Sequence, residues 1–223
     1  MAESNDTYTG EEEAIDLNFK SEVSLNALFE LRSPRIPAKS VPVFDDTLNA
    51  VIGYCHQSTV GIYRLYNLNG DVVGLEEDGL ETPLVDPIDL VFFMGGIIRV
   101  AGKGVLSLFS KTSAKVLSAG ATRLLANSLT GAILGAMRSA FKGLSANSLK
   151  FTATTAARMA ASGRHVPIHI LHLAIKYGKR VPDPQGVKGA FMYTANILKN
   201  GKKYALEIVV REKDWTILHF LYK

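Results

Sequence analysis

The stretch ANILKNGKKYALEIVV, residues 195–210, decides the fold that the sequence predicts. Strand-forming runs flank Asn200-Gly201, which is a strong signal for a two-residue β-hairpin turn. A third run, DWTILHFLYK, follows at residues 214–223. The expected strands are roughly residues 189–197, 202–210 and 215–222. Two helical patterns precede them, so this part of the chain predicts a small α+β domain in which two helices precede an antiparallel meander.

The length of the loop after residue 210 decides on which face of the sheet His219 lies, because side chains alternate along a strand. The apolar face is expected to carry Phe191, Tyr193, Ile197, Tyr204, Leu206, Ile208 and Val210. The polar face is expected to carry Thr194, Asn196, Lys203, Ala205 and Glu207. A four-residue loop at 211–214 pairs His219 with Leu206 on the apolar face. An odd loop places His219 on the polar face, opposite or diagonal to Ala205 and Glu207. We favour the odd loop, because it buries Leu218, Phe220 and Tyr222.

On the polar face, His219 has the properties of a general acid or base. Its unperturbed pKa is about 6.5, a neighbouring carboxylate can orient the ring, and nearby cations can bind an anionic substrate. In the other register, His219 is a core residue whose ring bonds to a backbone carbonyl. Both interpretations stay open at the level of the sequence.

The two predicted helices lie between residues 151 and 180. FTATTAARMAASGR is expected to be capped near Thr152 or Thr154 and to end at Gly163. PIHILHLAIKYGKR is expected to start at Pro167 and to end at Gly178. Its apolar stripe consists of Ile168, Leu171 and Ile175.

His165, His169 and His172 follow one another at spacings of four and three, which places them on one helical stripe. Such a stripe raises the question of a zinc site. No cysteine or carboxylate lies nearby in the sequence, and one short helix rarely supplies three ligands. We therefore favour a solvated or nucleic-acid-facing stripe over a metal site.

The net charge of +4 is distributed unevenly over the 223 residues. Residues 1–89 carry a balance of −12, whereas residues 90–150 and 151–223 each carry +8. We expect four segments. These are an acidic, poorly structured lead at 1–40 with at most a short helix near 21–32, a β-hairpin region at 41–85, a basic helical connector at 86–150, and the functional domain at 151–223. The hairpin region contains the similar stretches VFDDTLNAVIGY and LYNLNGDVVGLE, and Asp86 is a candidate helix cap.

Residues 88–144 are rich in Ala, Gly, Leu, Ser and Lys, but charges interrupt every apolar run of 18 residues. A helical linker packed on its own chain is favoured here, and a membrane-active segment is the alternative. The single cysteine, Cys55, excludes an internal disulfide and predicts a buried structural thiol. The N-terminal MAESNDTYTGEEE is too polar and acidic for a signal peptide.

The cations of residues 151–223 exceed what helix dipoles require, because only Lys176, Lys179 and Arg180 lie at a helix end. The cations elsewhere include Arg158, Arg164, Lys188, Lys199, Lys202 and Lys203. Such a surplus predicts a polyanionic partner. No phosphate-binding loop, dinucleotide fingerprint or GxSxG is present, so neither a nucleotide cofactor nor a serine hydrolase is predicted.

The ordered motifs R-M-x-x-S-G-R-x-V-P, A-I-K-x-G, P-D-P-Q-G, N-G-K-x-Y-x-L-E and H-F-x-Y resemble the C-terminal toxin domains of bacterial polymorphic toxins. These domains end Rhs-repeat and contact-dependent inhibition proteins. The upstream PLVDPIDL and the Gly/Ala/Lys-rich segment are similar in composition to pre-toxin connectors. The resemblance implies a barnase/EndoU/colicin/RelE-like fold and a metal-independent ribonuclease, in many cases specific for tRNA. The matched polar residues are Arg158, Arg164, Lys176, Lys203, Tyr204, Glu207, His219 and Tyr222. Related domains often carry a histidine early in the first helix, where this chain has Thr154 and Thr155, so the division of acid and base roles is open.

The expected function is that of a secreted or delivered antibacterial effector that cleaves RNA in the cytoplasm of a target cell, without a cofactor or metal. The expected catalytic residues are His219, Arg158, Lys203 and Glu207. The expected RNA-binding residues are Arg164, Lys176, Lys179, Arg180, Lys202 and Tyr222. The expected partners are RNA, in particular tRNA, a cognate acidic immunity protein, a larger carrier protein, and transiently a membrane through residues 88–144. The alternatives are a membrane-active toxin and a nucleic-acid-binding module without catalysis.

Overall fold

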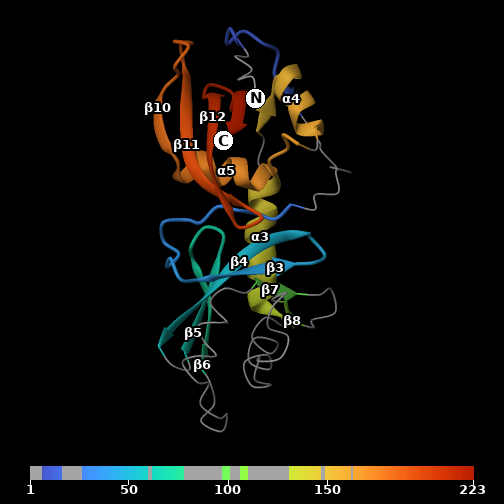
Figure 1. Ribbon diagram of the computed structural model, residues 1–223, viewed down its shortest axis with the longest axis vertical. Helices are drawn as coiled ribbons and strands as arrows, with labels where there is room; N and C mark the ends of the chain where they lie inside the picture. Colours follow the sequence, from blue (N-terminus) through green and yellow to red (C-terminus); the bar gives the residue numbers. More distant parts are fainter. Residues whose placement is uncertain are drawn as a thin grey trace. The chain divides into compact units, whose positions relative to one another are not determined.

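The computed structural model describes residues 7–16, 27–59, 62–77, 97–100, 106–109, 131–146, 149–161 and 163–223 (Figure 1). The chain forms two compact units. The C-terminal unit comprises Met1–Leu31 together with Leu144–Lys223, and the central unit comprises Arg32–Gly143. The described residues form an α+β structure with mostly antiparallel sheets, as the sequence predicts.

The sheet of the C-terminal unit is built on the meander that the sequence predicts. Its central strands are β11 (Ala190–Lys199), β12 (Lys202–Arg211) and β13 (Thr216–Tyr222). The other strands are β1 (Ile15–Asp16), β2 (Phe29–Glu30), β9 (Lys150–Phe151) and β10 (Lys179–Pro182). The order is β1-β9-β13-β12-β11-β10, and β2 also pairs with β11. Only β13 and β9 run parallel among these pairs.

The turn between β11 and β12 confirms the predicted hairpin. Lys199 pairs with Lys202, and the two loop residues have positive φ values, 51° at Asn200 and 77° at Gly201. A two-residue type I′ turn requires positive φ at both positions, which asparagine and glycine adopt at little cost.

His219 lies on the polar face, as favoured, but a bulge in β13 places it there and not an odd-numbered loop. Arg211 pairs with Thr216, so four residues form the loop, but a bulge near Leu218 adds one residue to β13. This extra residue changes the alternation. His219 therefore pairs with Val209 and lies on the face of Glu207, which confirms the preferred face. His219 is a diagonal neighbour of Glu207, as expected, but it does not lie beside Ala205, which is four residues from Val209 along β12.

The apolar face of this sheet is buried for the most part. Its buried side chains are Tyr193, Ile197, Leu206, Ile208, Val210 and Phe220. Phe191, Tyr204 and Tyr222 are only partly buried, and Leu218, which was expected in this core, packs with Tyr8 on the other face. α5 (Ile168–Tyr177) contacts β11 and β12, while α4 (Ala153–Ala160) contacts β9 and β13. The helix starts are also confirmed, because Thr152 forms a capping box with Thr155 and Pro167 precedes α5.

The described N-terminal residues 7–16 and 27–31 belong to this unit, so these parts of the expected lead are structured. Ile15 and Asp16 pair with β9, and β2 pairs with the end of β11. Residues 7–16, which we call the strap, cover part of the polar face, where Tyr8 packs with Val209 and Leu218. Ala190, Val187 and Met192 of the C-terminal residues belong to the same cluster. Residues 17–26, which include the first half of the expected short helix, lie outside the described residues, and β2 lies in its second half.

The central unit contains the two successive hairpins that the sequence predicts. The strands are β3 (Val41–Asp45), β4 (Ala50–Thr59), β5 (Ile62–Asn67), β6 (Val72–Glu77), β7 (Ile97–Val100) and β8 (Leu106–Phe109). Their order is β6-β5-β4-β3-β7-β8. The expectation of a wholly helical connector at 86–150 is wrong, because β7 and β8 extend this sheet. Residues 78–96, 101–105 and 110–130 lie outside the described part, and they include Asp86 and PLVDPIDL.

The helix α3 (Ala132–Ala146) uses its apolar side for packing within the central unit. Leu134 and Met137 join the buried cluster formed by strand residues such as Ile52 and Leu65. Arg138 Nε donates to Asp45 Oδ2 at 2.6 Å, so an acidic N-terminal segment pairs with a cation of the basic segment. No helix within the described ranges has the length and apolar character needed to cross a membrane.

Replacing Arg138 with alanine is expected to destabilise the protein by about 2 kcal/mol, because it removes a hydrogen bond to a buried charged group. Asp45 is 0% exposed, so its carboxylate has no access to water as a substitute partner. Denaturant unfolding of the full chain measures the loss. Lys142→Ala, which removes an exposed cation from the same helix, is the matched control and should have little effect. Equal losses in both variants would contradict the role of the Arg138–Asp45 pair.

Candidate functional site

The site is built around His219 where β13 extends beyond its parallel neighbour. β9 pairs only with Thr216 and Ile217 of β13. The guanidinium of Arg158, from the last turn of α4, approaches the next part of the strand. Its Nη1 donates to the carbonyl oxygen of Phe220 at 3.0 Å and lies 3.2 Å from Nδ1 of His219. The structure therefore brings together two of the predicted catalytic residues, one from a helix and one from a strand.

This contact determines the form of the His219 ring. Arginine has only donors, so Nδ1 of His219 must accept the hydrogen bond and the proton of the neutral ring must be on Nε2. Burial lowers the pKa of His219, and the positive charge of Arg158 lowers it further, while Glu207 and Asp183 act in the opposite direction. The imidazole is therefore neutral near pH 7, with an N–H available at Nε2.

Carboxylates approach His219 from two directions. Glu207 lies two residues from Val209 on the same face, so it is a diagonal neighbour of His219. Its carboxylate also pairs with Lys223 Nζ at 3.0 Å. Asp183 is buried in the turn before β11, where Oδ2 accepts from the backbone N–H of Val187. The expected combination of histidine, carboxylate and cation is thus present, although the carboxylates do not bond directly to the ring.

Sequence reasoning missed three residues at this site. Asp183 stands in the P-D-P-Q-G motif, and a carboxylate inside a Pro-rich turn was the signal that could have identified it. Lys223 shares the polar face, since its N–H and carbonyl bond with Ala205. Tyr8 had no local signal. Its ring centroid is 6.1 Å from that of His219, and its hydroxyl donates to Asp183.

Lys203 does not lie beside His219, which corrects the expected geometry. It pairs with Leu198 near the hairpin turn, six residues along β12 from Val209. At about 3.3 Å per residue, the two positions are separated by about 20 Å. The alternation of faces was predicted correctly, but the distance depends on the register of β13, which the bulge changes.

The predicted RNA-binding residues form two groups. Arg164 lies close enough to Arg158 to lower the pKa of that guanidinium, after the larger effect of burial. The hydroxyl of Tyr222 donates to the carbonyl of Gly163 at 2.8 Å, next to Arg164. These two residues are therefore near the His219 site, although Tyr222 lies on the opposite face of β13 and accepts a hydrogen bond from Lys199.

The other group lies further away. Lys179 pairs with Thr194, so it shares the polar face with His219, but β10 is three strands from β13, or about 15 Å. Arg180 is bonded twice to Glu212, at 2.7 and 2.9 Å, and its guanidinium stacks on Phe191. Lys176 lies over the ring of Tyr177, and Lys202 is exposed at the hairpin.

The histidine stripe is not solvated, contrary to our expectation. His165 and His169 are buried, and Nδ1 of His165 donates to the carbonyl of Met159 at 2.8 Å. The apolar surroundings favour neutral rings, because a buried charge lacks water. No group of metal-ligating side chains occurs in the part of the chain that the structure describes.

The buried histidine His169 is expected to make the C-terminal unit sensitive to acid. Burial lowers its pKa to about 3, and the charges of His165 and His172 add to the effect. The unfolded chain binds this proton near its unperturbed pKa of about 6.5. The contribution of the neutral His169 ring to the free energy of unfolding is therefore fully present above pH 6.5. It is lost as the pH decreases toward the folded pKa, by up to about 1.4 kcal/mol per pH unit for one such group.

Chemical unfolding measured as a function of pH in the full chain tests this expectation. The slope of unfolding free energy against pH, not its absolute value, should decrease in His169→Gln, since glutamine does not titrate. His56→Gln, in the central unit, is the comparison. Burial also lowers the pKa of His56, but this ring is only partly buried, so the slope should decrease less than in His169→Gln. An unchanged slope in His169→Gln would show that another group is responsible.

Comparisons with protein-family models, curated proteins and solved structures found no match for this chain. The geometry of the site therefore has to support any function by itself. A neutral imidazole beside a guanidinium, on a sheet face with further lysines, can bind a phosphate and transfer a proton at the same place.

Proposed function

We propose that the C-terminal unit is a metal-independent endoribonuclease and the toxic part of an antibacterial effector. The observation that supports this most strongly is the contact between Arg158 and His219 at the edge of β13. A guanidinium held by the backbone carbonyl of Phe220 is a preorganised donor for a phosphodiester, and the imidazole beside it is within reach of the same group.

In this proposal, a phosphate oxygen of the RNA replaces Nδ1 of His219 as the acceptor of Arg158. The lone pair of Nδ1 becomes available, and the negative charge of the phosphate offsets the effect of Arg158 on the pKa of His219. The ribose 2′-oxygen attacks phosphorus, and the bond from phosphorus to the 5′-oxygen breaks. The proton of the 2′-hydroxyl ends on the leaving 5′-oxygen, and His219 transfers it as general base, general acid or both.

The products of this reaction are a 2′,3′-cyclic phosphate and a free 5′-hydroxyl. Arg158 stabilises the charge that develops on the phosphoryl oxygens. Glu207 and Asp183 favour the protonated ring electrostatically while it holds the transferred proton. Lys203 has no place in this step, because it lies about 20 Å away along the strand. Together with Lys179 it is instead suited to bind backbone phosphates of the same RNA.

The order of the elements also supports a barnase/EndoU/colicin/RelE-like fold for this unit, and the resemblance of the motifs suggests tRNA as the substrate. Helices α4 and α5 precede the strands β11, β12 and β13, as in the resemblance drawn from the motifs. A protein of this kind requires a carrier for delivery and an acidic immunity protein that covers the basic surface in the producing cell.

Expression of the full chain inside bacterial cells tests the proposal. We expect growth to stop, and RNA recovered from these cells should contain new fragments with 2′,3′-cyclic phosphate and 5′-hydroxyl ends. Loss of membrane potential with intact RNA would favour a membrane-active toxin instead. Binding of RNA without new ends would favour a nucleic-acid-binding module.

A further inference from the structure

The strap, residues 7–16, lies over the part of the polar face that contains His219. Tyr8 is only 8% exposed, and its ring packs with the buried side chains of Val209 and Leu218. The ring also faces that of His219 with an angle of 33° between their planes. The hydroxyl of Tyr8 donates to Asp183, which places the Tyr8 ring between this carboxylate and the imidazole.

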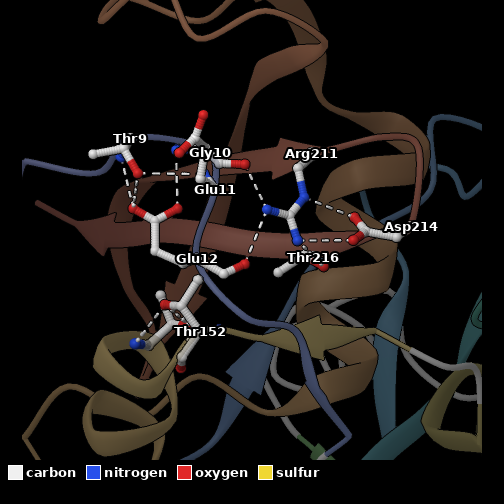
Figure 2. A network of polar contacts seen from close by, with 9 residues as sticks. Thr9, Gly10, Glu11, Glu12, Thr152, Arg211, Asp214 and Thr216 are labelled. Atoms are coloured by element: carbon white, nitrogen blue, oxygen red, sulfur yellow. Dashed lines mark hydrogen bonds and ion pairs between the residues drawn. The ribbon is translucent and has the colours of Figure 1, made fainter.

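Further contacts fix the strap to the sheet (Figure 2). Arg211 Nη1 donates to the carbonyl oxygens of Gly10 and Glu12, at 2.6 and 3.0 Å, while Asp214 holds the other side of the guanidinium. The carboxylate of Glu12 turns back to accept from the N–H groups of Thr9 and Gly10. Gly10 has a φ of +84°, and a Cβ atom there would lie 2.2 Å from Val187 Cγ1, so only glycine fits this approach.

The strap is acidic, whereas the C-terminal residues are basic overall. Residues 7–16 contain four carboxylates and no lysine or arginine, whereas residues 151–223 carry a balance of +8. The strap therefore presents an aromatic ring beside His219 and belongs to a segment of negative charge. An RNA strand presents the same two features, a base that stacks and phosphates that are anionic.

We propose that the strap is an intramolecular inhibitor that occupies the RNA position at the His219 site and must leave before RNA binds. This inference rests on the proposed function and specifies how that site is regulated. RNA displaces the strap by placing a base where Tyr8 lies, next to the His219 ring. Since strap and RNA exclude each other, any partner or modification that withdraws residues 7–16 raises the activity of the site.

The approach of Gly10 to Val187 allows the strap to be locked reversibly. A Cβ atom at residue 10 would be 3.5 Å from Cβ of Val187, and a disulfide requires a Cβ–Cβ distance of about 3.5–4.5 Å. The full-chain variant Gly10→Cys/Val187→Cys should therefore form a disulfide when oxidised, because the second substitution removes the valine methyl groups that exclude a Cβ at residue 10. The positive φ at residue 10 then costs about 1–2 kcal/mol. The native Cys55 should not interfere, because it is buried and burial raises the pKa of its thiol to about 12.

Two measurements are made on the oxidised and the reduced form of this one protein. The first is binding of a non-cleavable 2′-O-methyl RNA, and the second is cleavage of the matching RNA. We expect the oxidised form to bind and cleave at least about ten-fold more weakly, with full recovery on reduction. The single variant Val187→Cys, which cannot form the bridge, should not respond to oxidation.

The possible outcomes distinguish failure of the inhibitor proposal from failure of the ribonuclease proposal. Equal binding and cleavage in the two forms would overturn the strap as an inhibitor while leaving a ribonuclease. A second variant tests the strap without a disulfide: Tyr8→Ala removes the ring beside His219, and unchanged RNA binding in this variant would also overturn the inhibitor. Binding that increases on reduction without any cleavage would support the strap and contradict the ribonuclease. Absence of RNA binding in both forms would overturn both.

Discussion

Replacing His219 with alanine is expected to lower the rate of RNA cleavage by about 10²–10⁴-fold, the usual contribution of a positioned acid or base. The folded structure should change little. The ring is only partly buried, and β13 stays anchored by Phe220 and Ile217, which are on the buried side of the unit. We expect a loss of unfolding free energy of about 1 kcal/mol. Thermal unfolding and cleavage, measured on the same preparation, give the two values.

The matched control is His56→Ala, which removes an imidazole from β4 of the central unit and should leave cleavage unchanged. A different pattern would contradict the assignment of His219. If His219→Ala unfolded at a much lower temperature but still cleaved RNA when cold, the histidine would be a structural residue. The loss of stability would then resemble a core substitution, roughly 2–4 kcal/mol.

Replacing Arg158 with alanine is expected to affect cleavage, stability and the titration of His219 together. Loss of a donor to the reacting phosphate should lower the cleavage rate by about 10²–10³-fold. The carbonyl of Phe220 loses its partner as well, which should cost about 1–3 kcal/mol. Because the charge of Arg158 lowers the pKa of His219, that pKa should rise in the variant.

Nuclear magnetic resonance titration of the His219 ring measures this last effect, which loss of stability alone does not produce. Arg158→Lys is the informative comparison, since lysine keeps the charge but not the fork of donors. It should keep the pKa of His219 low while cleavage stays impaired. If Arg158→Ala left both the pKa and the cleavage rate unchanged, the pair would not be the site.

The parts of the fold that local sequence determines were predicted correctly. Asn200-Gly201 sets the hairpin through its positive φ values, Thr152 caps α4 with its side chain, and Pro167 and Gly178 flank α5. The strands β1, β2 and β9 were missed, because each has two residues and pairs with a distant part of the chain. Periodicity cannot identify strands that short.

The candidate site could be predicted only in part for the same reason. Alternation along β12 placed Glu207 on the polar face, but the bulge near Leu218 decided that His219 is there too. No local pattern indicated that Arg158 reaches β13, although the helix and strand were both predicted. Tyr8 reaches His219 from the other end of the sequence, so only the three-dimensional structure identifies it as a neighbour.

The most direct test of the central claim is single-turnover cleavage of one RNA and of its counterpart with a 2′-deoxy residue at the cut site. Both substrates are incubated with the purified full chain and with His219→Ala. The account predicts a 2′,3′-cyclic phosphate from the RNA with the natural chain alone, and no cleavage of the deoxy substrate by either protein. Cleavage of the deoxy substrate, or equal rates with His219→Ala, would contradict it.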